Sequence, residues 1–494
     1  MSNTVPAYIL GQAQRSFHHV DAVDDPLQLM IEIARQALDD AGISAEQVDG
    51  IGCVDPLSWT YADLAHKVGN GAGCGSDIRE FWLPGGGTTP QDLLHEIASA
   101  MAVGELDVAV LVGAEAMRTR RKATRAGREL PWPPRDKSVK PMRGQKPFTS
   151  EWEAKHGLRL PIQSFPMLEN ALRHAHQRSA QEQINLAARI LRKNALVAAS
   201  NENAWFQDAP EASDISTVTP ENRMISYPYT KRMNAIMDVD QSAALVVVSD
   251  RFLQQHGRRD RAAAVLGGAG AEEVWNPMQR RNLSECAAMD VAFADALASA
   301  GVALSEIHAF DFYSCFPSPI QLALDALDIA VDDPRPFSIT GGLAYGGGPG
   351  NNYVMHSLAT AVQLLRDHPE QRLFITGVGM ANTKHAATVL SNADHVPAKA
   401  SGMTRYRIDT GEEELPVVEK ANGRASIVTY TIEYDRAGVP VNVIYILDTA
   451  QGRAVANAPD ARAAALVLLQ SDPIGLAGEL AWDEQAGRQF FTIN

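Results

Sequence analysis

The stretch "GGGPGNNYVMHSLATAV", residues 346–362, joins a glycine turn to an amphipathic helix, and it has a counterpart in "GGGTTPQDLLHEIASAM", residues 85–101. Another matched pair precedes these two: "QALDDAGISAEQVDGIGCVD" begins at Gln36 and "DALASAGVALSEIHAFDFYS" begins at Asp295. The pairs occur in the same order and at a nearly constant separation. The chain therefore contains two copies of one unit with an insertion between them.

Each copy alternates helical periodicity with short apolar strands, such as "DVAVLVGAEAM" from Asp107 and "RLFITGVGM" from Arg372. This pattern predicts an α/β fold in which helices cover the faces of a sheet. The glycines let each helix begin close to neighbouring backbone and direct its first N–H groups at one point, which suits an anion or an oxyanion. A nucleotide-phosphate loop does not fit, because Asn351 and not lysine follows Gly350.

The bulk composition narrows the class of protein. With 494 residues, 45% of them hydrophobic, the chain is long enough for more than one packed domain. Its net charge of -15 argues against nucleic acid as a partner, and no apolar run reaches the ~20 residues of a membrane span. The N-terminus lacks a signal-peptide pattern, so we expect a cytoplasmic protein. The cysteines have no metal-site or disulfide spacing, and we expect no metal; they are Cys53, Cys74, Cys286 and Cys315.

The duplicated unit, with a glycine turn before a helix in each copy, resembles the thiolase superfamily. "GELDVAVLVGAEAM" from Gly104, "DFYSCFPS" from Asp311 and "GGLAYGGGPGNN" from Gly341 carry the resemblance, which covers roughly Val5 to Asn392. It includes thiolase-like proteins, often labelled acetyl-CoA acetyltransferase, that have an extra C-terminal domain. The resemblance implies a duplicated thiolase fold, in which two similar α/β halves have helices packed on and between sheets, plus a small C-terminal β-barrel.

The same resemblance implies a division of the chain into domains. The last part alternates β-rich runs with turns, as in "GRASIVTYTIEYDRAGVPVNVIYILDT", which is typical of a small barrel of OB type. The expected segments are an N-terminal half of residues 1–117 and 234–258, a loop domain of residues 118–233, a C-terminal half of residues 259–397 and a barrel domain of residues 398–494.

The chain departs from thiolases at the positions that carry their chemistry. Gly87 takes the place of the acyl-accepting cysteine, and Gly348 takes the place of the histidine that stabilises the thioester oxyanion. Ile375 takes the place of the second cysteine. Glycine and isoleucine side chains can hold neither an acyl group nor a proton. We therefore expect no ordinary thiolysis through an acyl-cysteine.

Three other side chains are candidates for proton transfer. Cys315 matches an acid/base cysteine of sterol-carrier-type thiolases, and a helix expected after Pro317 would stabilise its thiolate; a buried apolar residue is the alternative. Tyr313 matches an acid/base tyrosine of a thiolase-fold aldolase branch, with packing as the alternative. His385 follows the last strand and could act as a base or oxyanion donor; a histidine bonded to backbone is the alternative.

The glycine turns suggest a place for the thioester. The N–H groups of Gly87 and Gly348 are expected to hold an enolate oxygen. Tyr345 is close enough in sequence to reach the same place, and Asn351 and Asn352 are expected to donate amide N–H groups to the thioester carbonyl. Capping of the following helix is the alternative role for the two asparagines.

The insertion opens with the basic run "RTRRKATRAGR". In thiolases this region covers coenzyme A, so the resemblance implies that Arg118, Arg120 and Arg121 meet its phosphates. A solvated charged face is the alternative for these arginines.

Taken together, the sequence predicts a protein that acts on coenzyme A thioesters, with acyl-CoA as its small-molecule partner and a homodimer as its expected assembly. As an enzyme it would be an acyltransferase or carbon–carbon lyase, making or breaking the bond next to the thioester carbonyl by retro-Claisen or aldol chemistry without an acyl-cysteine. The alternative is a protein that binds acyl-CoA and has lost catalysis, because the three thiolase side chains are missing.

Overall fold

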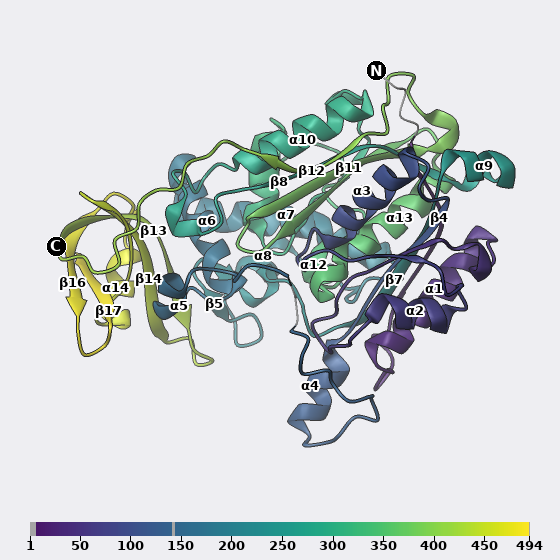
Figure 1. The fold of residues 1–494 in the computed structure, drawn as a ribbon. Helices are drawn as coiled ribbons and strands as arrows, with labels where there is room; N and C mark the ends of the chain where they lie inside the picture. The colour runs from purple at the N-terminus through teal and green to yellow at the C-terminus, as the bar shows by residue number, and fades with distance from the viewer. Residues whose placement is uncertain (1–5, 141–143, 494) are drawn as a thin grey trace.

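A ten-stranded mixed sheet forms the centre of an α/β body in the computed structural model, which describes residues 6–140 and 144–493 (Figure 1). Every residue of three central strands is buried, so both faces of the sheet are covered. The strands lie in the order β3 (Arg79–Phe81), β2 (Gly50–Cys53), β4 (Val108–Ala116), β7 (Asp240–Val248), β1 (Tyr8–Ser16), β8 (Ala263–Glu272), β11 (Lys384–Asn392), β10 (Arg372–Gly379) and β9 (Ala309–Asp311), and β12 (Thr404–Asp409) pairs with β8.

The pairing pattern confirms the predicted duplication. In the first half β2 is parallel to β4, and β4, β7 and β1 follow as antiparallel neighbours. In the second half β9 is parallel to β10, and β10, β11 and β8 follow in the same antiparallel way. The two halves join where β1 pairs with β8.

Helices of the two copies occupy equivalent places. α1 and α10 pack on the strands of their own halves, and both end at a glycine in the left-handed conformation, Gly42 (φ 71°) and Gly301 (φ 62°). α3 and α13 contact each other and strands of both halves, so they form the shared central layer. The helices of the body are α1 (Pro26–Ala41), α2 (Leu64–Ala72), α3 (Thr89–Ala102), α9 (Asp250–His256), α10 (Ala287–Ala300), α11 (Pro317–Ala326), α12 (Gly342–Tyr345) and α13 (Tyr353–Asp367).

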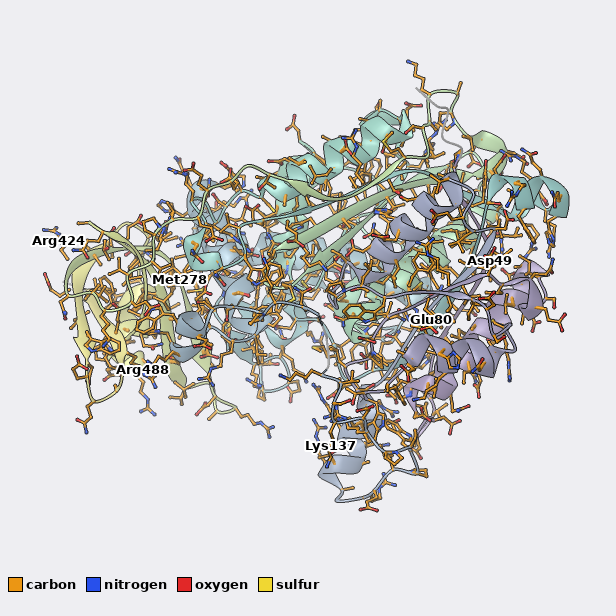
Figure 2. All side chains as sticks on the ribbon, viewed as in Figure 1. Asp49, Glu80, Lys137, Met278, Arg424 and Arg488 are labelled. Carbon is orange, nitrogen blue, oxygen red and sulfur yellow. The ribbon has the colours of Figure 1, made fainter. Side chains whose placement is uncertain are left out.

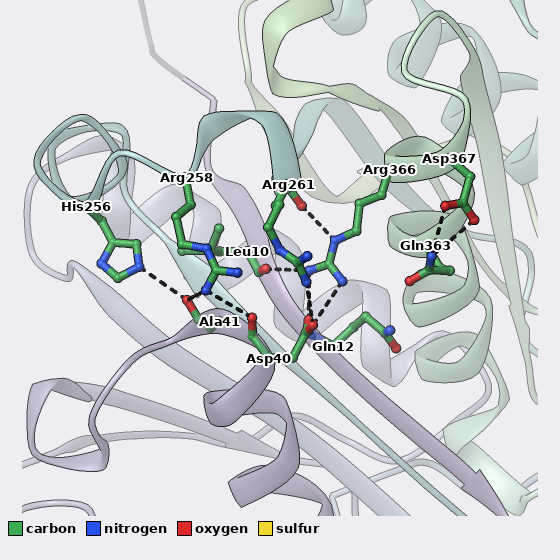
Figure 3. A network of polar contacts seen from close by, with 10 residues as sticks. All are labelled: Leu10, Gln12, Asp40, Ala41, His256, Arg258, Arg261, Gln363, Arg366 and Asp367. Atoms are coloured by element: carbon green, nitrogen blue, oxygen red, sulfur yellow. Dashed lines mark hydrogen bonds and ion pairs between the residues drawn. The ribbon is translucent and has the colours of Figure 1, made fainter.

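An ion-pair network ties the two halves together at one end of the sheet (Figure 3). The Asp40 carboxylate, at the end of α1, accepts hydrogen bonds from Arg366 at 2.7 Å and from Arg261 at 2.8 Å. It also accepts the backbone N–H of Gln12 at 2.9 Å. Arg366 comes from α13 in the second half and also donates to the carbonyl of Leu10 at 2.8 Å. The network therefore joins elements that are far apart in the sequence.

The insertion between β4 and β7 is mostly helical and extends from the α/β body (Figure 1). Its elements are α4 (Met117–Arg125), α5 (Glu151–Lys155), α6 (Pro161–Ala175), α7 (Ala180–Ser200), α8 (Ala212–Ser216), β5 (Met224–Ser226) and β6 (Tyr229–Thr230).

The C-terminal part of the chain closes into a five-stranded barrel, as the sequence predicts. Its order is β13, β14, β15, β17 and β16, with β16 returning to β13. A helix lies between the third and fourth strands, in keeping with an OB-type barrel. The elements are β13 (Gly423–Tyr434), β14 (Pro440–Thr449), β15 (Gly452–Asn457), α14 (Ala461–Leu468), β16 (Ala477–Asp483) and β17 (Arg488–Ile493).

The barrel is bonded to the rest of the molecule on two sides. Within the predicted barrel domain of residues 398–494, β12 belongs to the main sheet, so the barrel strands begin at Gly423. β13 pairs with β5 of the insertion, and β15 contacts the segment at Met278 of the body (Figure 2), where Arg453 donates to the carbonyl of Arg281 at 3.1 Å. The assignment of domain boundaries stays a prediction. In the described ranges, no helix combines the length and apolar character needed to cross a membrane.

Candidate active site

A cavity of about 710 Å³ lies among the two glycine turns, the end of β10 and the insertion. It collects several of the residues that the sequence singled out, from elements far apart in the chain. The predicted residues that line it are Gly87, Arg121, Tyr313, Cys315, Gly348 and Asn351.

Gly87 and Tyr313 occupy adjoining space at the buried end of this pocket. A Cβ atom on Gly87 would lie 2.5 Å from the Tyr313 hydroxyl oxygen and 2.8 Å from its Cζ, far inside van der Waals contact. The tyrosine ring is fixed by edge-on packing against Tyr353, with ring centroids 5.5 Å apart. The Tyr313 hydroxyl therefore stands where the side chain of residue 87 would begin.

The backbone before α3 presents a donor at the same place. In the described parts of the chain, no protein acceptor pairs with the N–H of Gly87. Close to this turn, the buried Lys384 ammonium lies 3.6 Å from the Asp92 carboxylate, which accepts a 2.7 Å hydrogen bond from the Thr88 hydroxyl. The helix start and the ammonium both favour negative charge near the Gly87 N–H.

Gly348 does not supply the second donor that the sequence predicted. Its N–H donates to the carbonyl of Ile236 at 2.9 Å, so it is already satisfied. Ala235, the residue before Ile236, donates its N–H to the carbonyl of Cys315 at 3.0 Å. The hydrogen bond from Gly348 therefore holds the glycine turn against the segment at Ile236, beside Cys315. Because its N–H is already paired, Gly348 has a structural role in place of the expected oxyanion role.

Cys315 lies at the start of α11, as predicted, but its thiol is not activated. Burial raises the pKa of the Cys315 thiol well above its usual range, and the backbone N–H groups near it offset this effect in part. Burial likewise raises the pKa of Tyr313, and the neighbouring Cys315 adds to the rise. The direction of this shift runs against the expected stabilised thiolate, because desolvation outweighs the helix N-terminus. Both groups are protonated at neutral pH, so they can donate protons.

His385 lies in a separate buried cluster and does not line the pocket. Its Nε2 is 3.3 Å from the sulfur of Cys286 and 3.2 Å from the carbonyl of Asn382. Burial lowers the pKa of His385 to about 4, so the ring is neutral. The Cys286 thiol also donates to the Glu273 carboxylate at 3.4 Å. These contacts agree with the alternative interpretation of His385, a histidine that is bonded to backbone. Among the described residues, no contact places it near Tyr313.

Two more of the candidate residues point away from the cavity. Tyr345 is buried and donates its hydroxyl to the carbonyl of Arg232 at 3.4 Å. Asn352 is buried against Gly113, where an added Cβ would meet its Oδ1. Asn351 does line the pocket, and its Nδ2 donates to the carbonyl of Asp55 at 3.4 Å. The pair of asparagines is thus divided between the pocket and the core.

The three predicted arginines have different environments. Arg118 donates to the carbonyl of Val20 at 2.7 Å, and Arg120 donates to the carbonyls of the segment at Leu57. Arg121 lines the pocket and pairs with Asp238 at 2.6 Å. Arg121 is therefore the one member of the predicted trio that borders the cavity.

The insertion supplies a wall of the pocket that the sequence did not identify. Phe148 and Phe165 give it an apolar surface, and Phe165 stacks on Phe316 with ring centroids 4.7 Å apart. Lys146 and Arg159 line the same cavity and are exposed, so positive charge stands at its open end. No short motif marks these positions. The sequence signal for this wall is the helical spacing of apolar residues at the start of α6.

The chemistry of the lining is limited. None of the described residues that line the cavity is an aspartate, a glutamate or a histidine. Across residues 6–140 and 144–493, no group of three or more such residues or cysteines could hold a metal ion. The site offers hydroxyl, thiol, amide and guanidinium donors beside an apolar wall.

Comparison with known proteins gives the class of the fold. The human mitochondrial 3-ketoacyl-CoA thiolase is 14% identical, covers 79% of this chain and 100% of its own, and has a TM-score of 0.58. The Ltp2-ChsH2(DUF35) aldolase is 19% identical over 79% of this chain and 99% of its own, with a TM-score of 0.60. The α/β body therefore has the thiolase fold. No curated protein matched the chain.

The C-terminal barrel and the full-length likeness refine this assignment. Residues 410–485 match the model for the "Thiolase-like protein type 1 additional C-terminal domain". A monomeric SCP2-thiolase-like protein type 1 from Mycobacterium smegmatis is 27% identical, with 100% of both chains covered and a TM-score of 0.82. The predicted resemblance to the thiolase superfamily, and to thiolase-like proteins with an extra C-terminal domain, is thus confirmed.

Proposed function

We propose that this protein acts on a coenzyme A thioester, changing the carbon–carbon bond next to the carbonyl without forming an acyl-cysteine. The observation that carries the proposal is the position of the Tyr313 hydroxyl, which stands where a side chain on Gly87 would begin. A proton donor takes the place of a nucleophile beside a backbone N–H that has no acceptor among the described residues.

The pocket is suited to the two ends of such a substrate. Arg121, Lys146 and Arg159 offer positive charge for the phosphates of coenzyme A. The apolar wall at Phe148 and Phe165 suits the acyl group. The thioester carbonyl would then lie at the buried end.

The donors at the buried end favour an enolate. When the bond between the α- and β-carbons breaks, its electron pair passes toward the thioester carbonyl and gives an enolate. A 3-hydroxy substrate then releases an aldehyde or ketone, and a 3-keto substrate passes its acyl group to the sulfur of free coenzyme A. The proton lost from that hydroxyl or thiol replaces the one that Tyr313 gives up. The Gly87 N–H and the Tyr313 hydroxyl can both donate hydrogen bonds to the enolate oxygen, and the Tyr313 proton can be transferred to the α-carbon. Cys315, next to Tyr313, offers a second proton at the same place.

The alternative function is binding of acyl-CoA without turnover. Its support is that neither carboxylate nor imidazole is found among the described residues of the pocket lining, so no strong base is at hand to accept a proton from the substrate.

The test is mass spectrometry of saturated, 3-hydroxy and 3-keto acyl-CoAs incubated with the protein, with and without free coenzyme A. We expect shorter acyl-CoA products from a 3-hydroxy or 3-keto substrate and no acyl adduct on the protein. Tyr313→Phe and Cys315→Ala should lose turnover while binding persists. Tyr345→Phe is the matched control, because Tyr345 is a buried tyrosine outside the pocket. An acyl adduct on any cysteine contradicts the mechanism, and binding without turnover supports the alternative.

A further inference from the structure

The turn between β10 and β11 enters the pocket in an unusual backbone conformation. Met380 and Asn382 both have positive φ angles, 60° and 57°. A bulky unbranched residue such as methionine rarely adopts this region, which costs on the order of 1 kcal/mol or more. Such a conformation persists where the surroundings impose it, and it is concentrated at ligand sites.

The surroundings of this turn do impose it. The Thr383 N–H closes the turn onto the carbonyl of Gly379 at 3.0 Å, and the Thr383 carbonyl accepts the N–H of Glu273 at 2.7 Å. The buried Arg280 donates to the Thr383 hydroxyl at 2.9 Å. The Asn382 carbonyl accepts from His385 at 3.2 Å when Nε2 carries the proton. The cluster around His385, which lies outside the pocket, therefore holds the turn that Met380 begins.

Met380 is placed where it would meet the acyl group close to the thioester. It lines the pocket with 9% of its surface exposed, as do Val378 and Tyr313, which are 4% and 7% exposed. Gly379, between Val378 and Met380, has no side chain that could line the pocket. Met380 is thus a long side chain at the buried end, close to the proposed position of the thioester.

We propose that Met380 sets the size of the acyl group that the pocket accepts, and that the turn held by Glu273, Arg280 and His385 keeps it in place. This proposal rests on the proposed binding of acyl-CoA. Its substrate class is a thioester with a short or slender acyl group, because the methionine side chain takes up space in the cavity close to the proposed position of the thioester.

The test compares two methionines of the same pocket. Met380 is buried, whereas Met237 lines the cavity with 40% of its surface exposed. Dissociation constants for coenzyme A, acetyl-CoA and branched or aromatic acyl-CoAs are measured by calorimetry for the unaltered protein, Met380→Ala and Met237→Ala. We expect Met380→Ala to raise the preference for a bulky acyl group about tenfold, as one or two methylene groups do in an apolar pocket. Affinity for coenzyme A itself should not change, and Met237→Ala should alter the preference much less than Met380→Ala, because Met237 is 40% exposed.

The outcomes separate this proposal from the function on which it rests. An unchanged preference in Met380→Ala, with acyl-CoA still bound, overturns the role of Met380 alone. Failure of the unaltered protein to bind any acyl-CoA overturns both. If Met380→Ala does not fold, Met380→Gly is the second variant, because glycine adopts the positive φ without cost and opens the same space.

Discussion

The carbonyl oxygen of Val378 lies against the α-carbon of Gly87, so closely that a Cβ on Gly87 would be 2.1 Å from it. This contact is between backbone atoms of β10 and of the turn before α3, and neither can rotate away as a flexible side chain would. The absence of a side chain at residue 87 is therefore built into the packing of the two halves.

A methyl group at this position should accordingly be costly. We expect Gly87→Ala to lower the free energy of unfolding by about 1–3 kcal/mol through overpacking, measured by denaturant titration. Gly75→Ala is the control, because a Cβ on Gly75 meets no atom within 4 Å; its effect should be within about 0.5 kcal/mol. Equal effects of the two changes would contradict the account of the turn.

The charged end of the pocket can be tested through Arg121. Arg121→Gln should weaken acyl-CoA binding about two- to fivefold at low salt and less at high salt, because exposed charges are screened. Arg118→Gln is the matched control, since Arg118 donates to the Val20 carbonyl and does not line the pocket. Titration calorimetry at two ionic strengths measures both. Equal weakening by both changes would mean that net charge, and not the site, attracts the ligand.

Buried neutral histidines predict loss of stability in acid. Burial lowers the pKa of His95 to about 4 and that of His356 to about 3. The unfolded chain takes up these protons near pH 6.5 and the folded chain only at lower pH, so stability falls as the pH drops from about 6.5 toward 4. Each histidine can contribute up to about 3 kcal/mol to this loss. His95→Gln should make the dependence of unfolding free energy on pH shallower, whereas the exposed His368→Gln should not. An unaltered slope in His95→Gln would contradict the assignment.

The network at Asp40 should matter more than an exposed ion pair. Arg366→Met leaves Asp40 with fewer partners in a mostly buried place, and we expect a loss of about 3 kcal/mol. Arg251→Met removes an exposed pair with Asp107, and its cost should be about 0–1 kcal/mol. Thermal and denaturant unfolding compare the two variants. A cost of Arg366→Met as small as that of the exposed pair would show that the network does not hold the halves together.

The repeat made much of the fold predictable. The matched segments at Gly85 and Gly346 both become glycine turns before central helices, because their small residues and helical spacing have the same packing role in each half. The barrel followed from local alternation of apolar residues, which reports strands directly. Local pattern could not show that β12 joins the main sheet, because that depends on pairing with a distant strand.

The candidate site was harder to predict from the sequence than the fold. Gly87, Tyr313 and Cys315 were found through the resemblance to thiolase motifs, and the pocket brings them together. The raised pKa of Cys315 could not be predicted from the sequence, because its burial depends on side chains from other elements. Met380 could not be found, because its role depends on a backbone conformation that no short motif indicates.

The pairing of β13 with β5 has a consequence for protein synthesis. Glu433 pairs with Ser226, and Thr429 donates its hydroxyl to the carbonyl of Met167 in α6 at 2.6 Å. The ribosome completes the insertion well before it makes β13. While the second half is translated, the edge of the β5–β6 hairpin and one face of α6 therefore have no β13 to cover them. A nascent chain paused before Gly423 would expose both to other chains, and uncovered strand edges and apolar helix faces favour association.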